Sequence, residues 1–201
     1  MMGGGPGEHP DIPEDFDDRE LPVVEIDRDL WRIYRNTFDN PLFFRREPLY
    51  RFDAPQGRYG VCYCGCDEYV SFVETLGHSP AINLITQAAL DARSLVQIKI
   101  GFPLKLVNLT GEGLRAMGAD SRLITGGDYE ISRQWSRAIY EHPTDVDGIL
   151  YRSRTDPSRQ SVAVFERASE RLQIVAEWRL GTDAGIQRIL PIINHYEFGV
   201  G

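Results

Sequence analysis

The 201 residues are enough for one folded domain with its own hydrophobic core, and 42% hydrophobic with 26% charged residues is ordinary for a soluble globular protein. There is no run of about 18 apolar residues and no signal-peptide pattern, so we expect a cytoplasmic protein that does not span a membrane. The net charge of −8 argues against direct nucleic-acid binding, which uses a basic surface.

The first 20 residues carry most of the net charge. They hold seven acidic side chains and one arginine, a net of −6, so the other 181 residues carry only −2. Glycines and prolines stand among these acids, which is typical of a segment that builds no core. We therefore predict a flexible acidic leader over residues 1–20 that buries little, either a solvated tail or a partner-binding segment. One folded domain is predicted over residues 21–201.

The segment LWRIYR, residues 30–35, predicts the first strand of the domain. Alternation places Leu30, Arg32 and Tyr34 on one face. An arginine among large apolar residues on a strand either extends to the surface or binds an anion. The loop that follows is rich in proline, phenylalanine and arginine, and its arginines are either solvated or available to bind phosphate: Arg45, Arg46, Arg51 and Arg58.

A strand that turns into a helix is predicted over residues 61–76. The strand alternates, Asp67 is suited to cap the start of the helix, and Gly77 is suited to end it. On the helix, Glu74 falls at the edge of the apolar face. A carboxylate there is either half-buried and held for a function, or it simply ends the apolar stripe.

The three cysteines share one face of that strand. Cys62, Cys64 and Cys66 are two residues apart, so their thiols spread along the strand and do not converge on a tetrahedral metal site. No CxxC pair or histidine cluster accompanies them. We interpret them as small apolar core residues and predict neither a metal site nor a disulfide framework.

The rest of the chain mixes strands and helices without a regular βαβ repeat. Helices are predicted over residues 79–95, with Ser79 as the cap and Pro80 in the first turn, and over 110–118, 127–142 and 183–194. Strands are predicted over 95–100, 104–110, 161–166 and 172–178, and over 146–158 where the strand runs into a loop. GxGxxG after a strand, Walker, HExxH and GxSxG motifs are missing, so no motif supports a Rossmann or hydrolase fold.

Three segments together resemble the RES domain family, which is named for an arginine, a glutamate and a serine. They are LWRIYR, then YRFDAPQGRYGVCYCGCDEYVSFVETLG, then DGILYRSRTDPS with the strand SVAVFE after it, and the match covers roughly residues 30–167. The resemblance implies a single α+β domain with an ADP-ribosyltransferase-like split mixed β-sheet flanked by helices, here with a C-terminal helical extension.

By position, the resemblance assigns the family arginine to Arg32, a second arginine to Arg51, the strand aromatic to Tyr63, the glutamate to Glu74 and the serine to Ser153. It implies that Glu74, Arg32 and Tyr63 are catalytic. It also implies that NAD is bound by both arginines, the tyrosine and the serine, which would position the nicotinamide ribose. This chain has RFDAP where the family often has GGRWN, which leaves the role of Arg51 open.

The family supplies the toxin of a bacterial toxin–antitoxin pair. The resemblance therefore implies a toxin that cleaves the nicotinamide–ribose bond of NAD, as a glycohydrolase or phosphorylase, with NAD as substrate and no cofactor. The implied partner is an antitoxin with an Xre-type helix-turn-helix domain, which would make the DNA contacts. Two alternatives stay open: transfer of ADP-ribose to a protein side chain, and a catalytically silent partner-binding module. The apolar segment over residues 189–198 either forms a homodimer or packs on its own domain.

Overall fold

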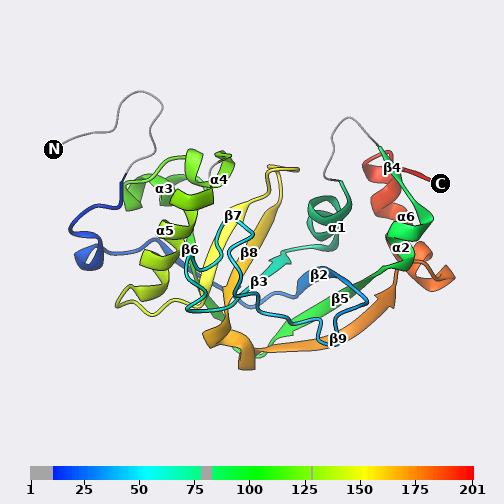
Figure 1. The fold of residues 1–201 in the computed structure, drawn as a ribbon, viewed down its shortest axis with the longest axis horizontal. Coiled ribbons are helices and arrows are strands. Elements are labelled where there is room, and N and C mark those ends of the chain that lie inside the picture. Colours follow the sequence, from blue (N-terminus) through cyan, green and yellow to red (C-terminus); the bar gives the residue numbers. More distant parts are fainter. Residues whose placement is uncertain (1–10, 78–82, 128) are drawn as a thin grey trace.

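An eight-stranded mixed sheet runs through the computed structural model, which describes residues 11–77, 83–127 and 129–201 (Figure 1). Its strands lie in the order β1-β6-β7-β8-β3-β2-β5-β9, and within this described sheet only β6 and β7 are parallel neighbours. The strands are β1 (Val23–Ile26), β2 (Leu30–Arg35), β3 (Val61–Gly65), β5 (Arg93–Ile100), β6 (Leu104–Asn108), β7 (Gly148–Arg152), β8 (Gln160–Phe165) and β9 (Leu172–Arg179).

The sheet is split at its centre, between β2 and β3. These strands are paired only at Trp31 and Gly65, whereas β2 is paired with β5 along its whole length and β3 with β8 likewise. β2 and β3 therefore diverge from a single point of contact. This arrangement confirms the predicted α+β fold with a split mixed sheet.

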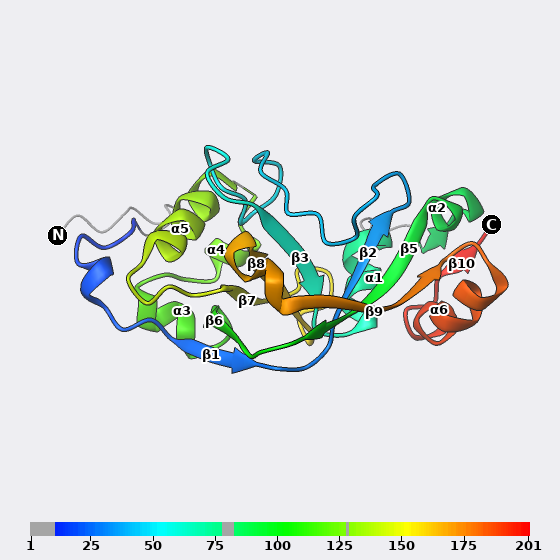
Figure 2. The same ribbon diagram turned by 90° about the horizontal axis from the view of Figure 1, so that it is seen from below.

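Helices cover both ends of the sheet (Figure 1). α3 (Glu112–Met117), α4 (Arg122–Thr125) and α5 (Tyr129–Glu141) stand at one end, and α2 (Gln87–Asp91) and α6 (Asp183–His195) stand at the other. α1 (Glu68–Leu76) lies between the two groups, beside the split. In the view from below, the short 3-10 turn Phe16–Asp18 and α6 lie near opposite ends of the molecule (Figure 2).

α1 is fixed directly to the point where β2 and β3 meet. Asp67 caps the helix by accepting a hydrogen bond from the Val70 N–H (2.9 Å), as predicted. Ser71 Oγ donates to the Trp31 carbonyl (2.6 Å) and accepts from the Gly65 N–H (3.2 Å). A Cβ on Gly65 would lie 2.6 Å from Ser71 Oγ, so only glycine lets the helix approach the strand this closely.

The prediction of one continuous helix over residues 79–95 is wrong. Ser79 and Pro80 lie outside the described residues; within the rest, β4 (Leu84–Ile85) comes first, and only Gln87–Asp91 is helical, capped by Thr86. From Arg93 onward the chain pairs with β2. The hydrogen bonds of a central strand outweigh the helical periodicity of the segment, which sequence alone could not reveal.

The acidic leader buries more than predicted. Residues 1–10 lie outside the described part, but Phe16, in a short 3-10 turn (Phe16–Asp18), is only 3% exposed. Its ring packs edge-on against Trp135 of α5 (5.5 Å between centroids) and against His142 (5.3 Å). Strand β1, which follows the leader and was not predicted, pairs antiparallel with β6.

The C-terminal segment packs on its own domain. Ile189, Ile192 and Ile193 of α6 are buried, and the last residues form β10 (Gly199–Val200), which pairs with β4. A homodimer through this segment stays a prediction. Within the described ranges, no helix is long and apolar enough to cross a membrane.

Candidate functional site

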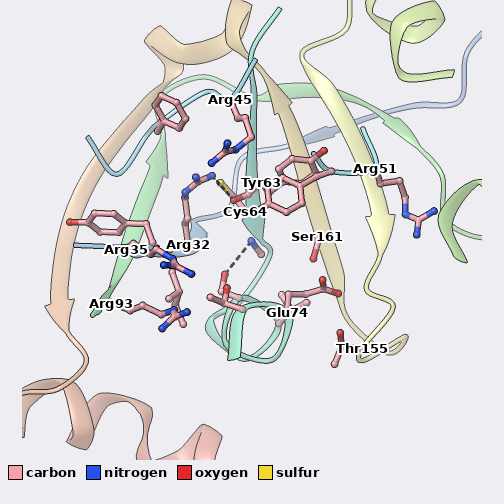
Figure 3. A pocket seen from close by; sticks show the side chains of 18 of the residues that line it. Arg32, Arg35, Arg45, Arg51, Tyr63, Cys64, Glu74, Arg93, Thr155 and Ser161 are labelled. Atoms are coloured by element: carbon pink, nitrogen blue, oxygen red, sulfur yellow. Dashed lines mark hydrogen bonds between the residues drawn. The ribbon is translucent and has the colours of Figure 1, made fainter. Parts of the chain in front are cut away.

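A pocket of about 960 Å³ opens where β2 and β3 diverge (Figure 3). Its walls come from β2, β3, α1, the loop between β2 and β3, and the start of α5. Arg32, Arg51, Tyr63 and Glu74, which the sequence singles out, all line it. The pocket therefore brings together residues from segments that are far apart in the chain.

The pocket is strongly positive although the protein is acidic. Among its described lining residues, Glu74 is the single carboxylate, and there are six arginines: Arg32, Arg35, Arg45, Arg51, Arg93 and Arg154. Arginines elsewhere, such as Arg159 and Arg171, form ion pairs with carboxylates. The pocket arginines keep their charge largely available for an anionic ligand, with phosphate oxygens as the best geometric match.

Glu74 lies in the last turn of α1 and is half-buried at the pocket wall. The hydroxyl of Ser153 donates a hydrogen bond to its Oε1 atom. The edge position predicted from the helix pattern is therefore correct, and the carboxylate has a fixed polar partner.

Ser153 lies behind Glu74, and its expected role in positioning the nicotinamide ribose stays a prediction. Its side chain is 2% exposed and is not among the residues that line the pocket. Its oxygen accepts the N–H groups of Thr155 (3.1 Å) and Asp156 (3.0 Å) while its proton is donated to Glu74. Within the described part of the chain, Ser153 contacts two residues that line the pocket, through the Glu74 carboxylate and the Thr155 N–H.

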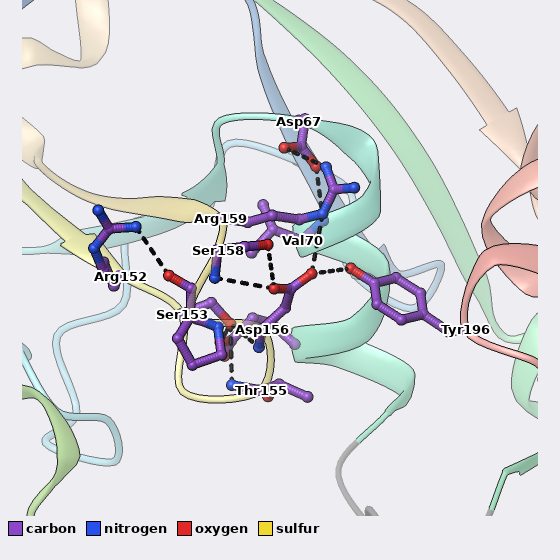
Figure 4. Close-up of polar contacts among 11 residues, drawn as sticks. Asp67, Val70, Arg152, Ser153, Thr155, Asp156, Ser158, Arg159 and Tyr196 are labelled. Carbon is purple, nitrogen blue, oxygen red and sulfur yellow. Dashed lines mark hydrogen bonds and ion pairs between the residues drawn. The ribbon is translucent and has the colours of Figure 1, made fainter.

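An ion-pair network locks the loop of Ser153 to the start of α1 (Figure 4). Arg159 bridges Asp67 (2.9 Å), the cap of α1, and Asp156 (3.1 Å). Tyr196, from the C-terminal segment, donates to Asp156 (2.6 Å). Burial alone would raise the pKa of Asp156, but hydrogen bonds from Ser158 and Tyr196 and the charge of Arg159 lower it overall.

Tyr63 presents its ring to the pocket and its hydroxyl to the protein. The hydroxyl donates to the buried Asp53 (3.0 Å) and accepts from the Phe52 N–H (2.9 Å). Burial, with the charge of Asp53, raises the pKa of Tyr63 well above its usual value. The tyrosine therefore stays protonated, its hydroxyl proton is donated to Asp53, and its ring faces the pocket.

Arg32 crosses from β2 toward β3. Its Nη1 atom donates to the Tyr63 carbonyl and to Cys62 Sγ, each at 3.0 Å, and its buried Nε atom has no partner within the described part of the chain. Cys62 and Cys64 are buried core residues, as predicted. A hydrogen bond with Cys64, aided by Arg32, lowers the pKa of Cys62 to about 7 although burial opposes the shift.

Arg51 lies across the pocket from Arg32, with Tyr63 and Glu74 between them in the view of Figure 3. It is 7% exposed, and its guanidinium carbon stands 4.6 Å from the ring centroid of Tyr129. Its Nη1 atom contacts Leu123 and Ser132, but its buried Nη2 atom has no partner within the residues described. A buried donor without an acceptor is costly, so this geometry favours an anionic ligand beside Arg51.

The model of the RES domain family matches residues 29–183. The chain belongs to the RES domain family. It is 32% identical over 87 residues to the probable toxin y4kH of Sinorhizobium fredii, an alignment that covers 43% of this chain and 68% of that protein. Its fold is similar to a chain in the crystal structure of the M. tuberculosis MbcT–MbcA toxin–antitoxin complex, with a TM-score of 0.67 and 19% identity over 89% of this chain and 98% of the other.

Several lining residues of this RES domain were not predicted. Arg35 and Arg93 are direct cross-strand partners, and burial together with the charge of Arg35 lowers the pKa of Arg93. The register of β2 against β5 would have revealed this pair. Of the four loop arginines for which solvation and phosphate binding were both left open, Arg46 and Arg58 form ion pairs with Glu166 and Glu141 and are not among the residues that line the pocket.

Proposed function

We propose that this RES domain protein is the toxin of a bacterial toxin–antitoxin pair and that it cleaves the bond between nicotinamide and ribose in NAD. The observation that carries the proposal is the composition of the pocket, with one carboxylate beside an aromatic ring and arginines on both sides. NAD has a matching charge pattern, because its diphosphate is anionic and its nicotinamide is cationic. NAD is here the substrate, and no metal or cofactor is needed for the step.

In this proposal the arginines hold the diphosphate, with Arg32 and Arg51 supplying free donors. The nicotinamide ring lies against Tyr63. When the bond between C1′ of the ribose and the nicotinamide nitrogen breaks, the electron pair leaves with nicotinamide, and C1′ becomes oxocarbenium-like. Glu74, held by Ser153, faces this developing positive charge and lowers its energy. Water then bonds to C1′ through its oxygen and releases one proton to the solvent, or a phosphate oxygen bonds to C1′ instead.

An antitoxin with an Xre-type helix-turn-helix domain is the proposed partner. The similarity of the fold to a toxin–antitoxin complex supports a protein partner, and the acidic composition supports leaving DNA contact to that partner. The related reaction, transfer of ADP-ribose to a protein side chain, uses the same bond cleavage and differs only in the acceptor.

The proposal is tested by measuring nicotinamide release from NAD by the purified chain, with and without phosphate, for the unchanged protein and for Glu74→Gln. We expect the variant to lose on the order of 100- to 1000-fold in rate. Glu170→Gln, an exposed glutamate outside the pocket, serves as the matched control and should keep full activity.

The products separate the acceptors. Free ADP-ribose indicates water, its 1″-phosphate ester indicates phosphate, and a mass increase on a protein indicates transfer. A chain that releases no nicotinamide under any of these conditions would refute the cleavage of NAD and leave a transferase without its protein target or a silent binding module. A Glu74→Gln variant as active as the control would refute the proposed role of Glu74 in the cleavage.

A further inference from the structure

Two phenylalanines stand exposed at the rim of the pocket. Phe38 and Phe43 are 40% and 37% exposed, and both line the pocket. Their rings lie nearly parallel, at an interplanar angle of 13°, with 5.6 Å between centroids. An exposed pair of large rings at the mouth of a charged pocket offers a flat apolar surface to a ligand.

Arg45, Tyr50 and Tyr63 extend this aromatic surface into the pocket as one continuous wall. The guanidinium carbon of Arg45 stands 5.7 Å from the ring centroid of Phe43 and 5.7 Å from that of Tyr50. Tyr50, itself 51% exposed, meets Tyr63 edge-on at 5.5 Å. Figure 3 shows Arg45 and Glu74 on opposite sides of Tyr63 in that view. This wall of the pocket therefore runs from the exposed Phe38 and Phe43 rings, past Arg45, to Tyr63. The Tyr63 ring lies beside the Glu74 carboxylate.

Arg45 is free to serve a ligand. Its ion pair with Glu47 is long, at 3.5 Å, and Glu47 is 66% exposed, so solvent screens the attraction. A planar cation between aromatic rings matches a ligand in which a phosphate lies between two flat bases. A dinucleotide has this order: base, diphosphate, base.

We propose that Phe38, Phe43 and Arg45 form the subsite for the adenine end of NAD. The adenine ring stacks on the exposed ring pair, and Arg45 contacts the phosphate on the adenosine side, while nicotinamide lies at Tyr63. This inference rests on the proposed function and adds that the enzyme recognises its substrate by both bases. Loss of one stacked base costs on the order of tenfold to a hundredfold in affinity.

The test compares the double variant Phe38→Ala/Phe43→Ala with the unchanged protein by calorimetric titration with ADP, which carries only the adenine end, and with nicotinamide mononucleotide, which carries only the other. We expect ADP binding to weaken at least tenfold and mononucleotide binding to stay within twofold. The KM for NAD should rise similarly while kcat changes little. Phe102→Ala, which removes a 74% exposed phenylalanine outside the pocket, is the control.

Equal losses of affinity for ADP and for the mononucleotide would mean that the rings only shape the loop. Unchanged ADP binding by the double variant would mean that adenine lies elsewhere. Either result overturns the inference, and so does an unchanged protein that does not bind ADP. Failure of the proposed function looks different, because nicotinamide release is then absent from the unchanged protein, while the ADP titration still decides whether the ring pair holds adenine.

Discussion

The hydrogen bonds that Ser153 accepts determine where its hydroxyl proton points. Its oxygen already accepts two backbone N–H groups, from Thr155 and Asp156, so the proton points to Glu74. This fixes one oxygen of the carboxylate, and in the proposed reaction the other oxygen faces the substrate. A group held in place before the reaction needs no reorganisation during it, which is the main source of electrostatic catalysis. At the scale of single residues, the serine therefore acts on the glutamate.

We expect Ser153→Ala to lower kcat for NAD by about 10- to 100-fold with little change in KM, because the carboxylate loses its orientation while the diphosphate contacts remain. A loss of folded protein would also lower the apparent kcat at constant KM, so kcat is calculated per folded protein, with the folded fraction of each variant measured by urea unfolding. Ser158→Ala changes an exposed serine of the same loop whose hydroxyl donates to Asp156, and this control should keep the kcat of the unchanged protein. A higher KM at constant kcat would instead favour direct contact of Ser153 with the substrate.

Among the elements, local signals predict α1 and its ends because everything that defines this helix lies within a few residues. The cap at Asp67, the apolar face and the end at Gly77 are all read from neighbouring positions. The segment before β5 fails for the opposite reason: Arg93 and Leu95 become a strand by pairing with β2, some 60 residues earlier in the chain. β1 is likewise defined by its partner β6. Strands whose partner is distant are the part of this fold that local pattern does not reveal.

Asp67→Ala is expected to lower the free energy of unfolding by about 1 kcal/mol through the lost helix cap, with a smaller loss from the half-exposed ion pair to Arg159. For a chain of this length that corresponds to a decrease of about 2–4 °C in Tm, measured by calorimetry. Asp67→Ser keeps a capping oxygen and removes the charge. It should recover most of the stability, and a serine variant as unstable as the alanine variant would show that the ion pair, not the cap, is the main contribution.

On the scale of the whole molecule, the site is assembled from segments that the fold brings together at the split of the sheet. Arg32, Tyr63 and Glu74 could be predicted to share a pocket because a short strand and helix carry the last two and the family order places the first. The aromatic rim and the opposed Arg35 and Arg93 could not, since they meet through the folding of a long loop and through strand register. The same assembly concentrates arginines in the pocket of an acidic chain, which local charge counts do not show.

The acidic leader contributes to the stability of the domain through Phe16. Its ring fills a place beside the fully buried Trp135, so Phe16→Ala leaves a cavity and should lower the free energy of unfolding by about 3 kcal/mol, seen as a lower urea midpoint with an unchanged slope. Asp17→Ala changes an exposed residue of the same turn and should have almost no effect. Because this contact lies at the α5 end of the sheet and outside the pocket, the folded fraction of Phe16→Ala should keep its KM for NAD. A midpoint equal to that of the Asp17 variant would mean that the leader is dispensable for stability, as its acidic composition predicts.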